Sequence, residues 1–230
     1  MTTHSLPPEY LGMWRRTLLE QAGVVDTSTL VLVIQTEQYH ADIRIPTDRP
    51  GFSGIECLAD CSAEQLRWLA SQQGFTGITQ VNDNISQWLR DYDYQPSNGQ
   101  RDIGEMTFES ADVIVEIGVD AEYREIWQKI KDTQLNLSVK HITGINRHGI
   151  ELPARLFTAG NHFAYVRPRS AVLPRAASLN EAIDTVNPNR DELLDWLDFE
   201  ISFGDIQDGL SGKIHHSTLP FREQAVMSLM

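Results

Sequence analysis

Basic residues, cysteines and long apolar runs are all scarce in this chain of 230 residues, and each shortage excludes a class of function. The 19 Lys and Arg residues are outnumbered by 32 Asp and Glu residues, which gives a net charge of −13 at pH 7. Proteins that bind nucleic acid present a basic face to the phosphate backbone, so we expect no nucleic-acid partner. The negative net charge is also explained by solubility alone, without any specific partner.

The sequence lacks the signals of membrane insertion and of export. No apolar run approaches the roughly 18 residues of a transmembrane helix, and residues 1–8 lack the basic start and apolar segment of a signal peptide. The two cysteines, Cys57 and Cys61, are the free thiols expected in a reducing compartment. We therefore expect a cytoplasmic protein without membrane contact. Two cysteines and no clustered histidine predict no metal site, and no cofactor is expected.

The pattern of apolar residues predicts a mainly β protein. Thr29 to Gln35 is a β-branched apolar run, which is typical of a strand buried on both faces. Tyr39 to Ile45 alternates instead, and Pro46 ends it because proline cannot donate to a ladder. The alternation places Ala41, Ile43 and Ile45 on one face and His40, Asp42 and Arg44 on the other.

One stretch of the chain occurs twice. Tyr39 to Pro46 is matched by His162 to Pro168, with Ala41, Ile43 and Arg44 corresponding to Ala164, Val166 and Arg167. Other features recur in the same order, namely an aromatic opening segment (Trp14 and Trp127) and a capping box (Ser62 and Ser178). This order predicts a tandem duplication of an antiparallel half, with Trp14 to Glu109 superposing on Val113 to the C-terminus.

The repeat divides the chain into residues 1–111 and residues 112–230. Each half is predicted to be an antiparallel β-barrel half that carries one short capping helix, beginning after Ser62 or Ser178. Tyr123 to Trp127 is expected to open the second half, and Leu135 to Ile142 is expected to add a strand without a counterpart in the first.

Short motifs resemble two groups of known proteins. Gly12-Met-Trp14 resembles the Gly-x-Trp motif at the start of lipocalin-like (calycin) barrels. Trp14-Arg-Arg16, Asp42-Ile-Arg-Ile-Pro46 and Ser217-Thr-Leu-Pro220 resemble the Hri protein family, which comprises fungal proteins of unknown function and uncharacterised bacterial relatives. The resemblance implies two tandem lipocalin-like barrels over nearly the whole chain. It implies no catalytic residues, and the cysteine pair of many secreted lipocalins is missing.

Asp42 and Arg44 lie two residues apart on one strand face and admit three interpretations. Inside a barrel they form a buried ion pair that contacts a polar ligand head, or a structural lock that closes the barrel. On the outside they form a solvated contact of little energetic value. The recurrence of the arginine as Arg167, with Tyr165 in the place of Asp42, favours the lock. We expect both arginines to be buried, with hydrogen-bond partners and an aromatic ring nearby.

An aromatic stripe adds further candidates. Trp88, Arg90, Tyr92 and Tyr94 alternate along one predicted strand, where they line a pocket or pack in a core. The candidate ligand-binding residues are Trp14, Asp42, Arg44, Trp88, Arg90, Tyr94, Trp127 and Arg167.

Catalytic residues are not predicted. His215 and His216 are adjacent on a predicted strand and therefore point to opposite faces, so they cannot chelate one metal ion. Ser217 follows them, but the chain has no Gly-x-Ser-x-Gly elbow.

The sequence therefore predicts a non-catalytic β-barrel that binds a small apolar or amphipathic ligand. The alternative is a protein-interaction module whose barrels are filled with side chains, and an enzyme of unknown class is the third hypothesis. The partner is thus a small molecule or a protein, and the oligomeric state is left open. An interior pocket of roughly 300 Å³ or more would distinguish the first hypothesis from the second.

Overall fold

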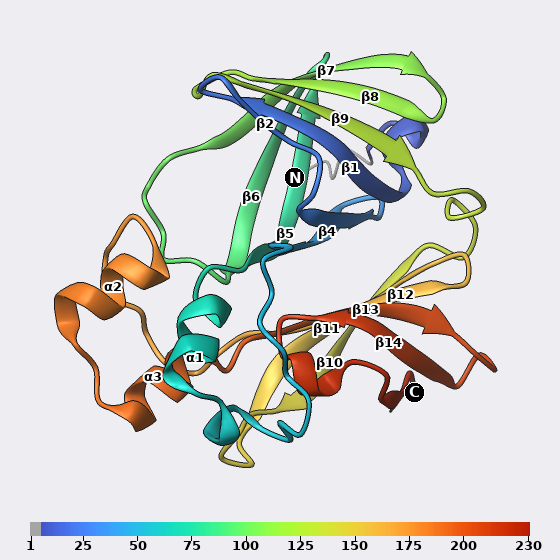
Figure 1. The fold of residues 1–230 in the computed structure, drawn as a ribbon. Coiled ribbons are helices and arrows are strands. Elements are labelled where there is room, and N and C mark those ends of the chain that lie inside the picture. The colour runs from blue at the N-terminus through green and yellow to red at the C-terminus, as the bar shows by residue number, and fades with distance from the viewer. Residues whose placement is uncertain (1–5) are drawn as a thin grey trace.

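The protein is built from two antiparallel sheets that stack on one another, as the ribbon shows (Figure 1). The structure, a computed structural model, describes residues 6–230. It confirms the predicted fold class, since the chain is mainly β with short helices, one closed barrel and a second, curled half-barrel sheet. No helix in the described part of the chain is both long and apolar enough to cross a bilayer.

The first sheet closes into a barrel of eight antiparallel strands. Closure occurs where β9 pairs with β1, with Trp14 opposite Lys129, and it removes the open edges that invite aggregation. A short strand, β2, pairs with the far end of β1. The strands are β1 (Gly12–Gln21), β2 (Val24–Asp26), β3 (Leu30–Gln35), β4 (Tyr39–Ile45), β5 (Gln73–Asn82), β6 (Ile85–Asp93), β7 (Asp102–Ser110), β8 (Val113–Gly118) and β9 (Tyr123–Lys129).

The second sheet is a meander that stays open between its first and last strands. Its bounds are β10 (Ser138–Ile145), β11 (Glu151–Ala159), β12 (His162–Arg167), β13 (Glu200–Ile206), β14 (Ser211–Ser217) and β15 (Val226–Ser228).

The change from one sheet to the other comes between Lys129 and Ser138, rather than at the expected boundary between residues 111 and 112. The strands β8 and β9 complete the first barrel. The segment Tyr123 to Trp127, expected to open the second half, is the strand that closes the first, because its hydrogen-bond partner is β1. The superposition of two duplicated halves stays a prediction.

Three short helices gather on one side of the molecule (Figure 1). They are α1 (Ala63–Leu69), α2 (Leu179–Val186) and α3 (Arg190–Leu197), with 3₁₀ turns at Pro8–Tyr10, Leu58–Asp60 and Pro220–Arg222. The predicted N-caps are confirmed, since Ser62 accepts a hydrogen bond from the Gln65 amide and Ser178 accepts one from the Glu181 amide. An ion pair between Arg67 and Asp184 joins α1 to α2.

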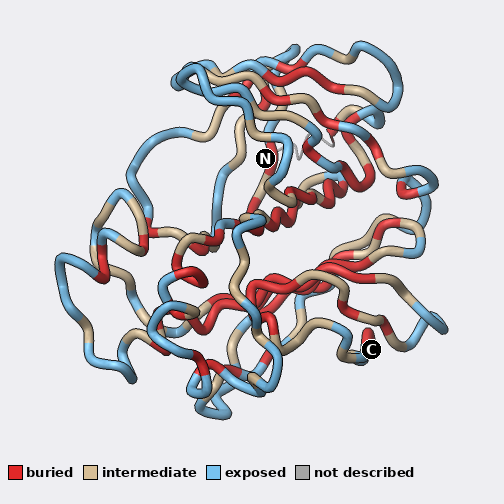
Figure 2. Tube along the Cα trace, in the orientation of Figure 1, coloured by how far each residue is buried: buried red, intermediate tan, exposed pale blue. Residues whose placement is uncertain are grey.

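The main core lies between the two sheets and is flanked by the helices. Buried residues concentrate along the facing surfaces of the sheets (Figure 2). Ala41 and Ile43 of β4 share this core with Ala164 and Val166 of β12, which confirms the predicted alternation. The other face of β4 consequently points into the barrel, where a separate apolar cluster contains Tyr10, Trp14, Val31, Met106, Ile114 and Trp127.

Candidate functional site

The interior of the barrel holds a cavity of about 360 Å³. Its wall combines apolar and aromatic side chains with charged side chains, so the cavity is amphipathic. The apolar wall includes Tyr10, Trp14, Val33, Phe75, Trp88, Met106, Ile114 and Trp127. The charged residues that line it are Arg16, Asp26, Asp42, Arg44, Asp102, Glu116 and Glu125.

Asp42 and Arg44 form an ion pair on the wall of the cavity, so the interpretation that their strand face points outward is wrong. The Nε of Arg44 donates to both carboxylate oxygens of Asp42 at 3.1 Å. The guanidinium lies 5.4 Å from the ring centroid of Phe75, at cation–π distance. Burial disfavours the charged form of Arg44. The negative charges of Asp42 and Glu125 outweigh the effect of burial, so the pKa of the guanidinium is raised. The predicted partner and aromatic neighbour of Arg44 are both present.

A second ion-pair cluster, not identified from the sequence, centres on Arg16 in β1. Its Nη1 lies 2.8 Å from Glu125 on β9, and its Nη2 lies 2.9 Å from Asp26 on β2. Arg16 therefore ties the closing strand and the added strand to β1. The contact joins residues more than a hundred positions apart in the sequence, so no local pattern indicated it.

Glu116 on β8 is a buried carboxylate held by neutral donors. The hydroxyl of Tyr123 donates to its Oε1 at 2.6 Å, and the Nε1 of Trp127 donates to its Oε2 at 2.9 Å. Glu125 lies directly opposite on β9. Burial, and then the charge of Glu125, raise the pKa of Glu116 to about 8. The only sequence signal was a lone carboxylate in the apolar strand Val113–Gly118.

Gly104 on β7 leaves the space that Glu116 occupies. A Cβ at Gly104 would lie 2.8 Å from the side chain of Glu116, so the carboxylate would have to move if a side chain were added there. The lack of a side chain at Gly104 thus lets the Glu116 side chain lie against β7.

A hydrogen-bond chain fixes the tautomer of His40. The amide nitrogen of Gln35 donates to the carbonyls of Thr36 and Tyr39, so its Oε1 is free to accept. The hydroxyl of Thr79 donates to that oxygen at 2.7 Å and therefore accepts from Nδ1 of His40 at 3.0 Å. The Nε2 of His40 is left as a buried acceptor that has no partner among the described residues. Burial lowers the pKa of His40 to about 3, so the ring is neutral.

The structure brings five of the eight candidate ligand-binding residues to the cavity wall, namely Trp14, Asp42, Arg44, Trp88 and Trp127. Arg90 is not a lining residue, but its guanidinium lies 3.7 Å from the ring centroid of Phe75 and 2.5 Å from Asp102, which both line the cavity.

Tyr94 lies elsewhere, in the core between the sheets, where its hydroxyl donates to the Leu69 carbonyl. A β-bulge explains the difference. Gly77 is opposite Arg90 and Thr76 is opposite Tyr92, so Asp91 is an extra residue that turns the rest of the stripe to the other face.

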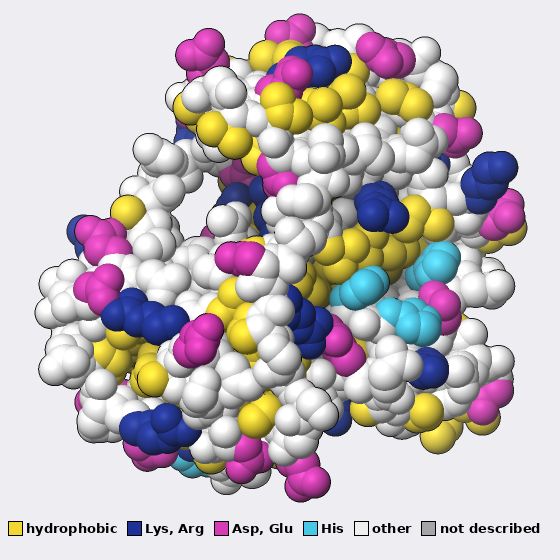
Figure 3. All heavy atoms as spheres, viewed as in Figure 1, with side chains coloured by type: hydrophobic (Ala, Val, Ile, Leu, Met, Phe, Trp, Pro, Cys, Tyr) yellow, Lys and Arg dark blue, Asp and Glu magenta, His cyan; other side chains and the backbone are white. Residues whose placement is uncertain are grey.

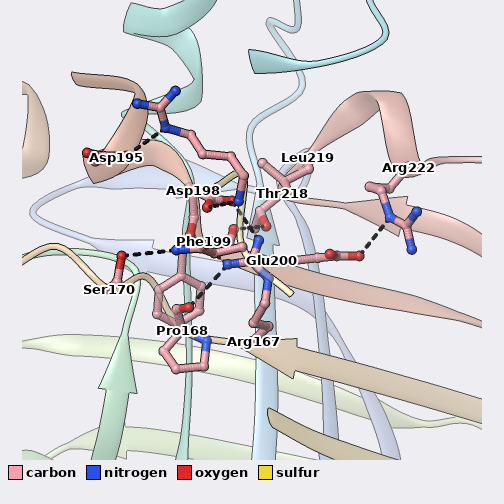
Figure 4. A network of polar contacts seen from close by, with 12 residues as sticks. Arg167, Pro168, Ser170, Asp195, Asp198, Phe199, Glu200, Thr218, Leu219 and Arg222 are labelled. Atoms are coloured by element: carbon pink, nitrogen blue, oxygen red, sulfur yellow. Dashed lines mark hydrogen bonds and ion pairs between the residues drawn. The ribbon is translucent and has the colours of Figure 1, made fainter. Parts of the chain in front are cut away.

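Arg167 also lies outside the cavity, in the second sheet, where it is 2% exposed. Figure 4 shows its guanidinium among oxygen acceptors: Nη2 donates to the Asp198 carboxylate at 2.6 Å, and Nη1 donates to the carbonyls of Asp198 and Pro168. Tyr165 is its aromatic neighbour, since a Cβ at Gly144 would touch both side chains. The acceptors around Arg167 belong to the protein, which fits the structural lock.

The remaining polar candidates do not converge on a site. His215 bonds Asp205 at 2.9 Å on the second sheet, away from the barrel interior. Residues 6–230 contain no group of three or more His, Cys, Asp or Glu side chains placed to hold a metal ion. Figure 3 shows acidic and basic side chains interspersed over the visible face, with apolar side chains between the two sheets.

Comparisons with known proteins add little to this geometry. No family model matches the chain, and no curated protein matches it. Among solved structures, it is similar to an uncharacterised protein from Bacteroides eggerthii DSM 20697, with a TM-score of 0.35 and 9% sequence identity. The similarity covers 53% of this chain and 99% of the other. A likeness of this degree carries no argument about function.

Proposed function

We propose that the barrel of residues 12–129 is a binding module for a small amphipathic molecule, which it holds in its interior. The observation that carries the proposal is the cavity of about 360 Å³, which falls in the range of small-molecule sites. A barrel that served only as a scaffold for protein contacts would fill this space with side chains, because cores pack to high density.

The composition of the wall supports an amphipathic ligand. Trp14, Trp88 and Trp127 offer apolar surface, while the charged residues of the wall offer polar contacts. A ligand with an apolar body and one polar group matches both kinds of lining side chain.

Binding rather than catalysis is supported by the direction of the hydrogen bonds. His40 and Thr79 stand at the distance of a base and a nucleophile. The hydroxyl proton of Thr79, however, goes to Gln35, and His40 donates to Thr79 instead of accepting from it. This pair therefore does not activate the hydroxyl.

Titration with the neutral fluorescent dye N-phenylnaphthylamine tests the proposal. We expect one dye per chain, with emission raised by the apolar wall. Val33→Trp places a large ring in the cavity and should abolish binding, whereas Val25→Trp adds the same ring at a position that is 59% exposed on β2 and should leave binding unchanged. Equal binding by both variants would show that the dye does not enter the barrel.

A further inference from the structure

We propose that the ligand of this cavity carries a positively charged nitrogen, an ammonium group held by the carboxylates of Glu116 and Glu125. The inference rests on the proposed function and names the chemical class of its ligand. Its basis is the balance of charges and of hydrogen-bond acceptors on the described part of the cavity wall.

Carboxylates outnumber arginines around the cavity. Two arginines line it, Arg16 and Arg44, and each is already engaged: Arg16 with Asp26 and Glu125, and Arg44 with Asp42. Arg90, which is not a lining residue, bonds Asp102 and Asp93. Glu116 is the lining carboxylate that has no cation within ion-pair distance among residues 6–230. It is nevertheless 4% exposed, so bulk water does not compensate its charge.

The position of Glu116 beside Glu125 suits a cation. The two carboxylates are directly opposed on adjacent strands, an arrangement that is unfavourable when both are ionised and nothing lies between them. An ammonium group at this place would satisfy both. Tyr123 and Trp127 each donate a hydrogen bond to Glu116 and so hold its two oxygens in place.

His40 gives independent support for a ligand that donates hydrogen bonds. Its unpartnered Nε2 belongs to a fully buried ring that lines the same cavity. The hydrogen-bond chain through Thr79 and Gln35 makes this nitrogen an acceptor, and an acceptor left without a donor is costly. A ligand that donated an N–H to this nitrogen would remove that cost, whereas a carboxylate ligand would not.

The opposite class, an anionic ligand, would use Arg44. The terminal nitrogens of Arg44 make no hydrogen bond within the described residues, so they could receive a carboxylate. Such a ligand would lie in the field of Glu125 and Asp102, the carboxylates that act on Arg44 in addition to Asp42. This repulsion is why the geometry points to a cation.

The raised pKa of Glu116 predicts how pH affects binding. A cation favours the ionised carboxylate, so below a pKa of about 8 binding must displace a proton, and affinity should rise about tenfold per pH unit until that pKa is passed. The groups that face Glu116 are Glu125 and Tyr123 on β9, Asp102 on β7 and Arg44 on β4. Arg16 on β1 acts through Glu125.

Isothermal titration calorimetry with three probes of one shape tests the inference on the full chain. The probes are phenethylamine, phenethyl alcohol and hydrocinnamate, which share the ring and differ in the charge of the head. We expect the amine to bind at least about tenfold more tightly than the alcohol near the pKa of Glu116, a difference of about 1.4 kcal/mol, and hydrocinnamate to bind most weakly.

Glu116→Gln provides the matched variant, because it keeps the shape and removes the charge. It should weaken amine binding by about tenfold and leave the alcohol unchanged, whereas Glu105→Gln, at an exposed position of β7, should change neither. A second measurement needs no variant. Titrations of the unaltered protein about one pH unit below that pKa, in buffers of different ionisation enthalpy, should show close to one proton released per amine and none per alcohol.

The outcomes separate the inference from the proposed function. If the alcohol binds as tightly as the amine, or no proton is released, the cavity binds ligands but does not select a cation. If hydrocinnamate binds most tightly, the ligand is an anion held by Arg44. If none of the probes binds and the neutral dye fails as well, the proposed function itself is overturned.

Discussion

Glu116 and Glu125 are cross-strand partners on β8 and β9, and Arg16 forms an ion pair with only one of them, Glu125. The other carboxylate is held by two neutral donors, and its pKa is raised to about 8 by burial and by Glu125. Glu116 therefore has no cation of its own within the part of the chain that the structure describes, and it keeps its proton up to about pH 8.

The raised pKa of Glu116 predicts how stability depends on pH. Since the pKa of Glu116 is higher in the folded chain than in the unfolded chain, the folded state binds more protons between about pH 4.5 and 8. Its contribution to stability is present below the unfolded pKa and is lost as pH rises through the folded pKa. Urea denaturation should show the unaltered protein losing stability relative to Glu116→Gln across this range. A constant difference between the two proteins would contradict the raised pKa.

His40 should give the opposite trend. Its folded pKa of about 3 lies below the ordinary 6.5, so its contribution is present above pH 6.5 and is lost as pH falls toward 3. In His40→Gln the free energy of unfolding should lose this part of its acid dependence. Replacing the exposed His141 by Gln serves as the control. If the free energy of unfolding of His40→Gln falls with acid as it does in the unaltered protein, the ring of His40 is not held neutral.

Arg44→Met should destabilise the barrel because it leaves the Asp42 carboxylate buried without its cation. Removing one partner of a buried pair costs about 3–5 kcal/mol, and we expect the lower end because 21% of the Arg44 side chain is exposed. Denaturant titration measures the loss. Arg101→Met breaks a bidentate pair with Asp120 on the surface and should have little effect. Equal losses of stability in Arg44→Met and Arg101→Met would contradict a larger contribution from the interior ion pair.

The Arg167→Met variant tests whether this arginine contributes to the stability of the fold or to ligand binding in the barrel. Arg167 is buried against Asp198 in the second sheet, so its loss should cost about 3–5 kcal/mol. The folded fraction should still bind N-phenylnaphthylamine normally, because the arginine lies outside the cavity. Loss of dye binding by a variant that retains its fold would make Arg167 part of the site.

The helix caps are the most local prediction. Ser62→Ala and Ser178→Ala each remove the acceptor for an end amide and should lower stability by about 1 kcal/mol. Ser53→Ala, at an exposed turn, is the matched control. Thermal melts in which all three variants coincide with the unaltered protein would contradict the caps.

The sequence was most informative where structure depends on neighbouring residues. The alternation of Tyr39–Ile45 correctly placed His40, Asp42 and Arg44 on one face, because side-chain direction in a strand has period two. The caps at Ser62 and Ser178 follow from spacing alone. Both of these features need no knowledge of which strands pair.

Features that depend on distant pairing could not be read in the same way. The pairing of β9 with β1, which closes the barrel, brings Glu125 to Arg16, but nothing local shows to which sheet β9 belongs. Because Asp91 is an extra, bulged residue, Tyr94 lies on the opposite strand face from Trp88. Bulges have no firm sequence signature, so this change of face was not predicted. The cavity itself depends on how eight strands curve together.

A crystal structure of the protein grown with phenethylamine tests the central claim most directly. The account predicts electron density for the ring among Trp14, Trp88 and Trp127, inside a barrel that keeps its cavity of about 360 Å³, with the nitrogen between Glu116 and Glu125. A barrel interior filled by its own side chains, or an amine bound elsewhere on the molecule, would contradict it.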